Sequence, residues 1–347
     1  MHRRLLCGVL TLCLVFGAVG CASFTAATPQ KASWLDVFDT VTGLTVYRMD
    51  GTDFYEKAEQ LHHRLIDYHR LFDIYHTYEG VNNLKTVNDN AGKAVAVDPL
   101  ILDLLEYGLS MYERTDGRVN ILFGAVLTRW HACRTAALAD PSAARLPQEA
   151  ALQEANRHTA PSLLEIDRGA GTVRLTDPQA SLDVGAIAKG YAAELAAAYA
   201  AEELGFTSAL LDVGGNLRAI GDKGGQPFSV GVKNPDADAA RPYLLTVGVA
   251  NGAAVTSGDY QRYFEVDGRR YAHIIDPDTL YPATYVRAVT VLCPHSGLAD
   301  ALSTALFVMP VEEGMAFLQT VPEAAAVWVL ADGSLRYSPN FESYILA

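Results

Sequence analysis

The chain has 347 residues, half of them hydrophobic by composition, and a formal net charge of −13 at pH 7. This acidic balance argues against a general nucleic-acid-binding protein, because such proteins need an excess of lysine and arginine to neutralise phosphates. The length is enough to bury a large core, as one big domain or as two closely packed ones.

The first 20 residues have the composition of a signal peptide. Basic residues precede an apolar run from Leu5 to Val19, which is too short to span a bilayer comfortably. Small residues then lead to Cys21 in a pattern that resembles a bacterial lipobox, although an alanine replaces the usual leucine. We therefore expect residues 1–20 to be a lipoprotein signal, Cys21 to carry lipid, and residues 21–33 to form a flexible tether. An ordinary secretory peptide and an uncleaved anchor are the alternatives.

A lipid on Cys21 would place the protein outside the cytoplasm, anchored to a bacterial membrane on its periplasmic side or at the cell surface. After the signal is removed, only Cys133 and Cys293 remain besides Cys21. Their positions do not suggest a zinc site, and they are compatible either with one disulfide or with two buried thiols.

Residues 34–347 have the patterns of one continuously folded domain. The sequence from Trp34 to Tyr47 predicts a strand. Thr52 is a plausible N-cap for the helix that follows, whose apolar residues recur every three or four positions from Phe54 to Phe72. The histidines of this helix are expected at the surface or in packing rather than as ligands; they are His62, His63 and His69.

Helices and hairpins are mixed along the rest of the chain. Asp98-Pro99 predicts the start of a second helix, which ends near Asp116-Gly117. A C-terminal hairpin is expected from Ala325 to Tyr337, with its turn at Asp332-Gly333. Because strands and helices do not alternate strictly, this order favours an α+β fold over a doubly wound α/β fold.

The segment from Ser181 to Gly190 ends a predicted strand in Asp183 and opens an alanine-rich helix with Lys189 in its first turn. A lysine at that position opposes the helix dipole, so it needs another reason to be there. Free N–H groups, glycines and a lysine together suit an anion such as phosphate. An ordinary helix start with a lysine that reaches solvent is the alternative.

A glycine pair follows in Leu210 to Gly221, which reads as a strand with glycines at its centre and then a second strand. Glycine inside a strand marks a bulge or a close approach to the backbone. A flat aromatic ligand and tight sheet packing both fit this pattern.

Residues 253–282 read as a tight turn followed by a hairpin. The turn is expected at Thr256-Ser257-Gly258-Asp259, and Asp267-Gly268 is a strong hairpin signal. The returning strand leads to His273 and Asp276, which we expect in a functional site; a satisfied core histidine is the alternative.

Near the C-terminus, Asp300 and Thr304 lie four residues apart in a helix of small apolar residues, so they share one face. An aspartate buried among alanines and leucines is costly unless it is paired. A carboxylate and a hydroxyl suit a magnesium-type ion. An exposed aspartate is the alternative.

Together these segments resemble the FAD:protein FMN transferases, the ApbE family. The motifs DVGAIAKGYA, LLDVGGNLRAIG, TSGDYQRYFE…HIIDPDTLYP and ADALSTAL occur in the order of that family. Upstream, Phe38-Asp39-Thr40, Val87-Asn88 and the run from Thr115 to Asn120 fit more loosely. The resemblance covers the chain from about Trp34 to its end and implies one large domain of mixed or antiparallel sheets with packed helices.

This resemblance implies a magnesium-dependent enzyme that splits FAD, releases AMP, and attaches FMN to a threonine or serine of an extracytoplasmic target flavoprotein. Magnesium would be held by the carbonyl of Ala186 with Asp300 and Thr304. The residues that would line the FAD site are Phe38, Tyr75, Arg118, Val119, Asn120, Asp183, Lys189 and Ile274.

For catalysis, we expect Lys189 to take charge from the phosphates and His273 to act as the base, with Asp276 orienting it. Four departures from the family pattern concern flavin affinity. Asn120 replaces an aspartate, Arg118-Val119 replaces Ala-Phe, Leu280 replaces the glycine of a turn, and the region from Tyr78 to Leu84 lacks the family's serine. A hydrolase that releases FMN and AMP, and a non-enzymatic FAD-binding lipoprotein, are the alternative functions.

Overall fold

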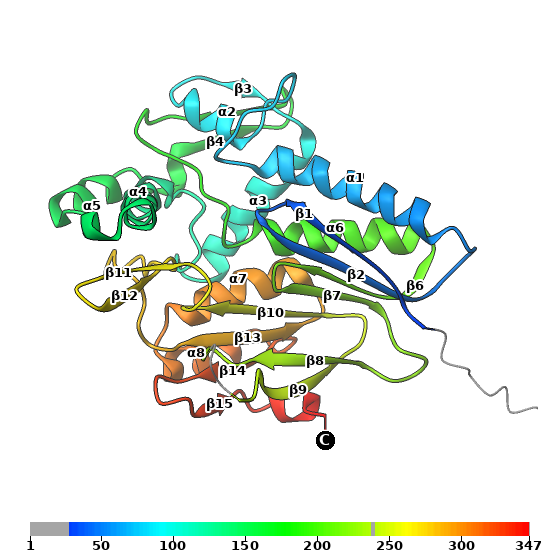
Figure 1. Cartoon of the computed structure of the whole chain (residues 1–347). Coiled ribbons are helices and arrows are strands. Elements are labelled where there is room, and N and C mark those ends of the chain that lie inside the picture. Colours follow the sequence, from blue (N-terminus) through cyan, green and yellow to red (C-terminus); the bar gives the residue numbers. More distant parts are fainter. Residues whose placement is uncertain (1–27, 237–239, 347) are drawn as a thin grey trace, which may run out of the picture.

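The computed structural model describes residues 28–236 and 240–346 (Figure 1). The predicted signal peptide and Cys21 lie outside these residues, so both stay predictions. The first strand begins at Gln30, so the predicted tether is wrong for residues 30–33. Within the described ranges, no helix has both the length and the apolar character needed to cross a membrane.

The centre of the domain is an eight-stranded sheet in which every neighbouring pair of strands is antiparallel. Its strands, in spatial order, are β1 (Gln30–Val37), β2 (Thr40–Met49), β6 (Phe206–Val213), β7 (Asn216–Gly221), β10 (Ala253–Gly258), β13 (Ala288–Cys293), β14 (Ala325–Val329) and β15 (Leu335–Tyr337). Together with the helices that cover it, this sheet confirms the predicted α+β class.

One face of the sheet is covered by helices (Figure 1). Helix α6 (Ala188–Glu202) packs on β6 and β7, and α7 (Ser296–Phe307) packs on β10 and β13. The other helices are α1 (Phe54–Phe72), α2 (Leu84–Asp89), α3 (Pro99–Arg114), α4 (Gly124–Ala139), α5 (Glu149–Asn156) and α8 (Val311–Leu318). The opposite face carries the small sheet of β8 (Phe228–Lys233) and β9 (Tyr243–Val249), whose apolar residues share a second core with it.

The local helix predictions are confirmed. The predicted apolar stripe of α1 is buried from Phe54 to Phe72, although the residue that caps this helix is Asp53 and not Thr52. Helix α3 begins at the predicted pair, where the Asp98 side chain accepts from the N–H of Leu100 at 2.9 Å. A third small sheet joins β3 (Val95–Ala96), β5 (Thr172–Leu175) and β4 (Leu164–Asp167).

Two predicted strands are in fact hairpins. The stretch from Trp34 to Tyr47 reverses at Phe38 and Asp39, whose φ angles are +54° and +49°. Gly214-Gly215 lies in the turn between β6 and β7, with φ of +59° and +90°, and not inside a strand. The two turns are adjacent, because a Cβ atom on Gly214 would lie 2.3 Å from Oγ1 of Thr40.

The turn predicted at 256–259 is wrong for its first three residues, since Thr256, Ser257 and Gly258 belong to the central strand β10 and the turn begins only at Asp259. Their hydroxyls are satisfied there: Thr256 bonds Thr290 on β13, and Ser257 bonds Ser303 on α7, both at 2.8 Å. The hairpin signal at Asp267-Gly268 is confirmed as the turn between β11 (Tyr263–Val266) and β12 (Arg269–Ala272). The C-terminal hairpin of β14 and β15 is confirmed as well.

A separate apolar cluster joins α4 and α5 to the β11–β12 hairpin. Its centre is Trp130, which packs against Phe264, Tyr271 and Tyr281. Residues of this cluster and of the central sheet both line the cavity described below. Cys133 and Cys293, for which two states were open, are free thiols.

Candidate active site

A cavity of about 920 Å³ opens between the edge of the central sheet, α4 and the β11–β12 hairpin. The β1–β2 turn, the start of α6 and the residues after β12 contribute to its wall. All eight residues expected at a flavin site line it: Phe38, Tyr75, Arg118, Val119, Asn120, Asp183, Lys189 and Ile274. Ala186, His273 and Thr304 also line this cavity, whereas Asp276 and Asp300 are not among its lining residues.

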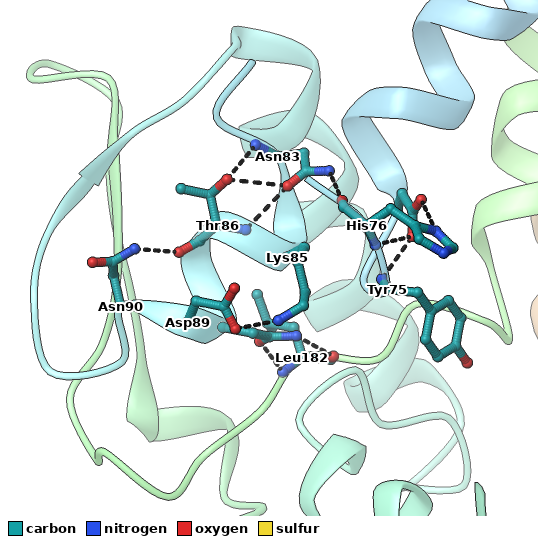
Figure 2. A network of polar contacts seen from close by, with 10 residues as sticks. Tyr75, His76, Asn83, Lys85, Thr86, Asp89, Asn90 and Leu182 are labelled. Carbon is teal, nitrogen blue, oxygen red and sulfur yellow. Dashed lines mark hydrogen bonds and ion pairs between the residues drawn. The ribbon is translucent and has the colours of Figure 1, made fainter. Parts of the chain in front are cut away.

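Asn88 fixes the segment that carries Asp183. Its side-chain amide donates to the carbonyl of Leu182 at 3.0 Å and accepts from the Leu182 N–H at 2.7 Å, as a neighbouring strand would (Figure 2). Asp183 then turns back to accept from the N–H of Gly185 at 2.8 Å. Burial raises the pKa of Asp183, while this hydrogen bond and the nearby charges oppose the rise.

Lys189 lies in the first turn of α6, as predicted, and lines the cavity. Among the described residues, its ammonium makes no hydrogen bond or ion pair. A lysine at the positive end of a helix, without a carboxylate partner, adds to the dipole in attracting an anion. The alternative of a lysine that merely reaches solvent does not fit its place in the cavity wall.

Asp300 is buried on α7, with 4% of its surface exposed, which excludes the alternative of an exposed aspartate. It accepts from the N–H of Gly190 at 2.8 Å, and the Asn216 amide donates to both of its oxygens, at 3.1 and 3.3 Å, when its nitrogen faces them. In the described ranges, no cationic side chain lies within ion-pair distance of this carboxylate. Burial raises the pKa of Asp300, and the charge of Lys189 opposes the rise.

A magnesium ion fits this arrangement. A buried carboxylate without a cation is costly, and a hard cation removes that cost. Thr304 is one turn further along α7, and both Thr304 and Ala186 line the cavity. Residues 28–236 and 240–346 contain no cluster of three His, Cys, Asp or Glu side chains suited to a metal. The donors available here are therefore one carboxylate with a hydroxyl and a carbonyl oxygen.

His273 follows β12 and has a defined tautomer. Its Nδ1 lies 3.1 Å from the carbonyl of Arg262, so Nδ1 carries the proton and donates to it. Burial, followed by the charges of Arg262, Lys189 and Arg134, lowers the pKa of His273 to about 3. The imidazole is therefore neutral at physiological pH, and Nε2 keeps a lone pair that can accept a proton.

Asp276 does not orient His273, so that prediction is wrong. The Asp276 carboxylate accepts from the N–H of Asp278 at 2.9 Å and from the Tyr285 hydroxyl at 3.3 Å. It also lies 3.8 Å from Arg118, which forms further ion pairs with Asp278 and with Glu313 at 3.0 Å. The guanidinium of Arg118 thus holds this loop against α8, while the residue still lines the cavity.

The turn at Leu280 keeps a left-handed shape although leucine replaces glycine. Leu280 has a φ of +64°, which is unfavourable for a side chain with a branched γ carbon. Two features compensate for this. The Leu280 side chain is 2% exposed and packs in the apolar cluster around Trp130, and the backbone carbonyl of Leu280 accepts from the Trp130 indole N–H at 2.9 Å. Asn120, another departure, caps its own turn by accepting from the N–H of Leu122 at 2.8 Å.

His131 and Arg134 on α4 also line this cavity, although no sequence pattern predicted them as site residues. Arg134 donates to Nδ1 of His131 at 3.1 Å, and the His131 ring stacks on Tyr75 with 5.2 Å between centroids. Arg262 also lines the cavity, and its guanidinium has no hydrogen bond or ion pair within the part of the chain that the structure describes. Arg134, Lys189 and Arg262 thus face the cavity without a carboxylate at ion-pair distance.

The chain is similar to proteins of one family. The sequence model of the ApbE family matches residues 38–328. A Treponema pallidum protein named FAD:protein FMN transferase is 37% identical over 272 residues, which cover 74% of this chain and 72% of that protein. A Klebsiella pneumoniae protein of the same name is 30% identical over 292 residues, covering 79% and 88%. The crystal structure of the ApbE protein from Thermotoga maritima superposes with a TM-score of 0.80 at 29% identity, covering 92% of this chain and 100% of that one. The chain therefore belongs to the ApbE family.

Proposed function

We propose that this protein is a flavin transferase, which moves FMN from FAD to a serine or threonine hydroxyl of a target flavoprotein and releases AMP. The names of its relatives support the flavin transfer. The observation that carries the proposal is the set of three cations, Arg134, Lys189 and Arg262, that face one cavity without carboxylate partners. A substrate with a pyrophosphate would supply the missing negative charge.

The dimensions of the cavity suit a dinucleotide. Its volume of about 920 Å³ is near the upper end of the roughly 300–1,000 Å³ that small-molecule sites occupy. Aromatic side chains stand on its wall, including Phe38 and the stacked pair of Tyr75 and His131. Flat rings can therefore pack at the wall while the phosphates reach the cations.

In the proposed reaction, Nε2 of His273 accepts the proton of the acceptor hydroxyl. The hydroxyl oxygen forms a bond to the phosphorus of the FMN half. The bond from that phosphorus to the bridging oxygen breaks, and AMP leaves with the electron pair. Lys189 and the arginines stabilise the charge that develops on the phosphates.

Asp300, Thr304 and the carbonyl of Ala186 would hold the magnesium ion. When bound, it would neutralise phosphate charge. This chain's own contribution there is to orient the Asp300 carboxylate and to oppose the rise of its pKa, through the N–H of Gly190 and the amide of Asn216.

Location and partner also belong to the proposal. A lipid on Cys21 would hold the enzyme at the outer side of a bacterial membrane, so its acceptor would be an extracytoplasmic flavoprotein.

There are two alternative functions. A hydrolase that gives FMN and AMP would use the same residues with water in place of the hydroxyl. A non-enzymatic FAD-binding lipoprotein would not need a proton acceptor such as the neutral His273 in its cavity.

The test combines the form that begins at Ala22 with FAD, Mg²⁺ and an acceptor that bears an exposed Asp-Gly-x-(Ser/Thr)-Gly-Ala-(Ser/Thr) segment. Acceptor mass and AMP are measured together, with and without EDTA. An FMN-sized mass gain matched by AMP, both lost in EDTA, is the expected result. AMP and free FMN without a mass gain on any acceptor tested would indicate the hydrolase. FAD that binds and stays intact would indicate the binding protein.

A further inference from the structure

The tip of the β1–β2 hairpin is a strained part of the cavity wall. Phe38 has a φ of +54°, a left-handed conformation that is an outlier for a bulky residue and costs about 1 kcal/mol or more. A residue at a hairpin tip also lacks a partner strand for its N–H. Some contact outside the hairpin must therefore hold this turn in place.

His69, near the end of α1, supplies that contact. The N–H of Phe38 donates to Nδ1 of His69 at 3.1 Å, and the two rings meet edge to face with 5.6 Å between centroids. Because Nδ1 accepts, the proton of the neutral ring is on Nε2. His69 was expected to be a packing or surface residue, but it lines the cavity.

The other side of His69 leads to Tyr75 through two more residues. Nε2 lies 3.1 Å from the Tyr78 hydroxyl, which donates to the buried carboxylate of Asp73 at 2.7 Å. The second oxygen of Asp73 accepts from the N–H of Tyr75 at 2.6 Å and of His76 at 3.2 Å. The hydrogen bonds therefore run in one direction. The Phe38 N–H donates to His69, the Nε2–H of His69 donates to the Tyr78 hydroxyl, and that hydroxyl donates to Asp73.

The loop that carries Tyr75 is fixed from its far side as well. Asn83 donates to the carbonyl of His76 at 2.8 Å and caps α2 through the N–H of Thr86 at 3.0 Å. Figure 2 shows the Tyr75 ring pointing away from this polar network. These bonds restrict the far side of the loop, and its near side is connected to His69 through Asp73 and Tyr78.

We propose that His69 is a positioning residue that sets the two aromatic walls of the cavity, Phe38 and Tyr75, relative to each other. One imidazole holds the Phe38 turn through Nδ1 and the Tyr75 loop through Nε2. In one respect this rests on the proposed function, namely that a flavin ring packs against these walls. The bonds themselves do not depend on that function.

The test uses four variants and one matched control. His69→Ala removes both bonds, His69→Asn keeps an acceptor near the position of Nδ1, and His69→Gln keeps a polar group near that of Nε2. Tyr78→Phe leaves the Phe38 bond and cuts the link to Asp73. If His69→Ala does not fold, the comparison of His69→Asn with His69→Gln still decides whether the Nδ1 bond holds the turn. His63→Ala is the matched control, because His63 lies on the same helix but is not among the residues that line the cavity; its contacts are with the exposed Glu59 and the ring of His62.

Two readouts separate this inference from the proposed function. The first is hydrogen exchange of residues 36–41 in the ligand-free protein. His69→Ala should accelerate it at least tenfold, and His69→Asn should restore it to within about threefold of wild type. The second is the FAD dissociation constant from flavin fluorescence. His69→Ala should raise it about tenfold, which corresponds to 1.4 kcal/mol, with kcat at saturating FAD little changed.

Tyr78→Phe should weaken FAD binding less than His69→Ala, and His63→Ala should change neither readout. Wild-type exchange at residues 36–41 in His69→Ala would overturn the inference. Rescue by glutamine and not by asparagine would also overturn it, because the Nδ1 bond would then not hold the turn. If wild-type protein fails to bind FAD, the proposed function fails, while the exchange data still decide the role of His69.

Discussion

His273 should remain neutral far below the pH at which an ordinary histidine titrates. Burial and three cations lower its pKa from 6.5 to about 3 in the ligand-free cavity. At pH 5 a histidine with a pKa of 6.5 would be only roughly 3% neutral, whereas one with a pKa of about 3 is roughly 99% neutral. Removing one of the cations, by Arg262→Gln, should move the pKa up by about one to two units.

The assay is the pH dependence of the imidazole nitrogen signals in NMR spectra of ligand-free protein between pH 4.5 and 8. His273→Ala identifies the signals of His273. The signals of wild-type His273 should not change with pH in this range. In Arg262→Gln they should begin to change at the acidic end of the range, because the pKa is higher. A wild-type midpoint between 6 and 7 would refute the account of the cavity as a cationic site.

The same shift has a consequence for stability, with a definite sign. The folded-state pKa of His273 is below the unfolded value, so the unfolded chain binds the extra proton between about pH 6.5 and 3. The stabilising contribution is therefore complete above pH 6.5 and is lost as the pH falls, by up to about 1.4 kcal/mol per pH unit. Urea unfolding of wild type and His273→Ala at pH 7 and pH 5 measures it, since the variant lacks this part of the slope.

Two further substitutions test the metal site and the Leu280 turn. Asp300→Asn keeps the shape of the side chain and the acceptor for the Gly190 N–H but removes a buried charge that has no cationic partner. The melting temperature of the ligand-free protein should therefore rise by about 2–4 °C, while magnesium-dependent transfer is lost. A lower melting temperature would contradict this. Leu280→Gly relieves a strained φ worth about 1 kcal/mol but removes a buried side chain worth about 2–5 kcal/mol, so urea unfolding should show a net loss of about 1–4 kcal/mol. A stabilised glycine variant would show that strain outweighs packing.

Local signals were enough to predict several elements from the sequence. The stripe from Phe54 to Phe72, the cap at Asp98 and the Asp267-Gly268 turn depend on residues close together in the chain, and all three are confirmed. The candidate flavin residues also converge on one cavity, since the motifs that carry them mark strand ends and helix starts.

Long-range contacts account for what the sequence did not predict. Phe38 and Asp39 contain no glycine or asparagine to mark a turn, and His69, 31 residues away, holds Phe38 there. Thr256 and Ser257 resembled turn formers, yet their hydroxyls are satisfied by partners on β13 and α7, which allows them inside a buried strand. Arg134 lies on a helix whose apolar residues show no clear face, so only the fold brings it to the cavity.

The cations that would bind the phosphates are the same ones that hold His273 neutral, so the two effects are coupled. An anion that neutralises Arg134, Lys189 and Arg262 removes the repulsion that lowers the pKa of His273, and Nε2 becomes a stronger base. The base would thus become effective only when a phosphate substrate is in place. Because coupling is reciprocal, protonated His273 should in turn bind anions more tightly. Adding inorganic pyrophosphate to the NMR titration should raise the His273 midpoint by at least one unit, and riboflavin, which has no phosphate, should not. An equal rise with riboflavin would contradict this account, because a ligand without phosphate cannot offset the charge of the cations, and its burial of the imidazole would lower the pKa.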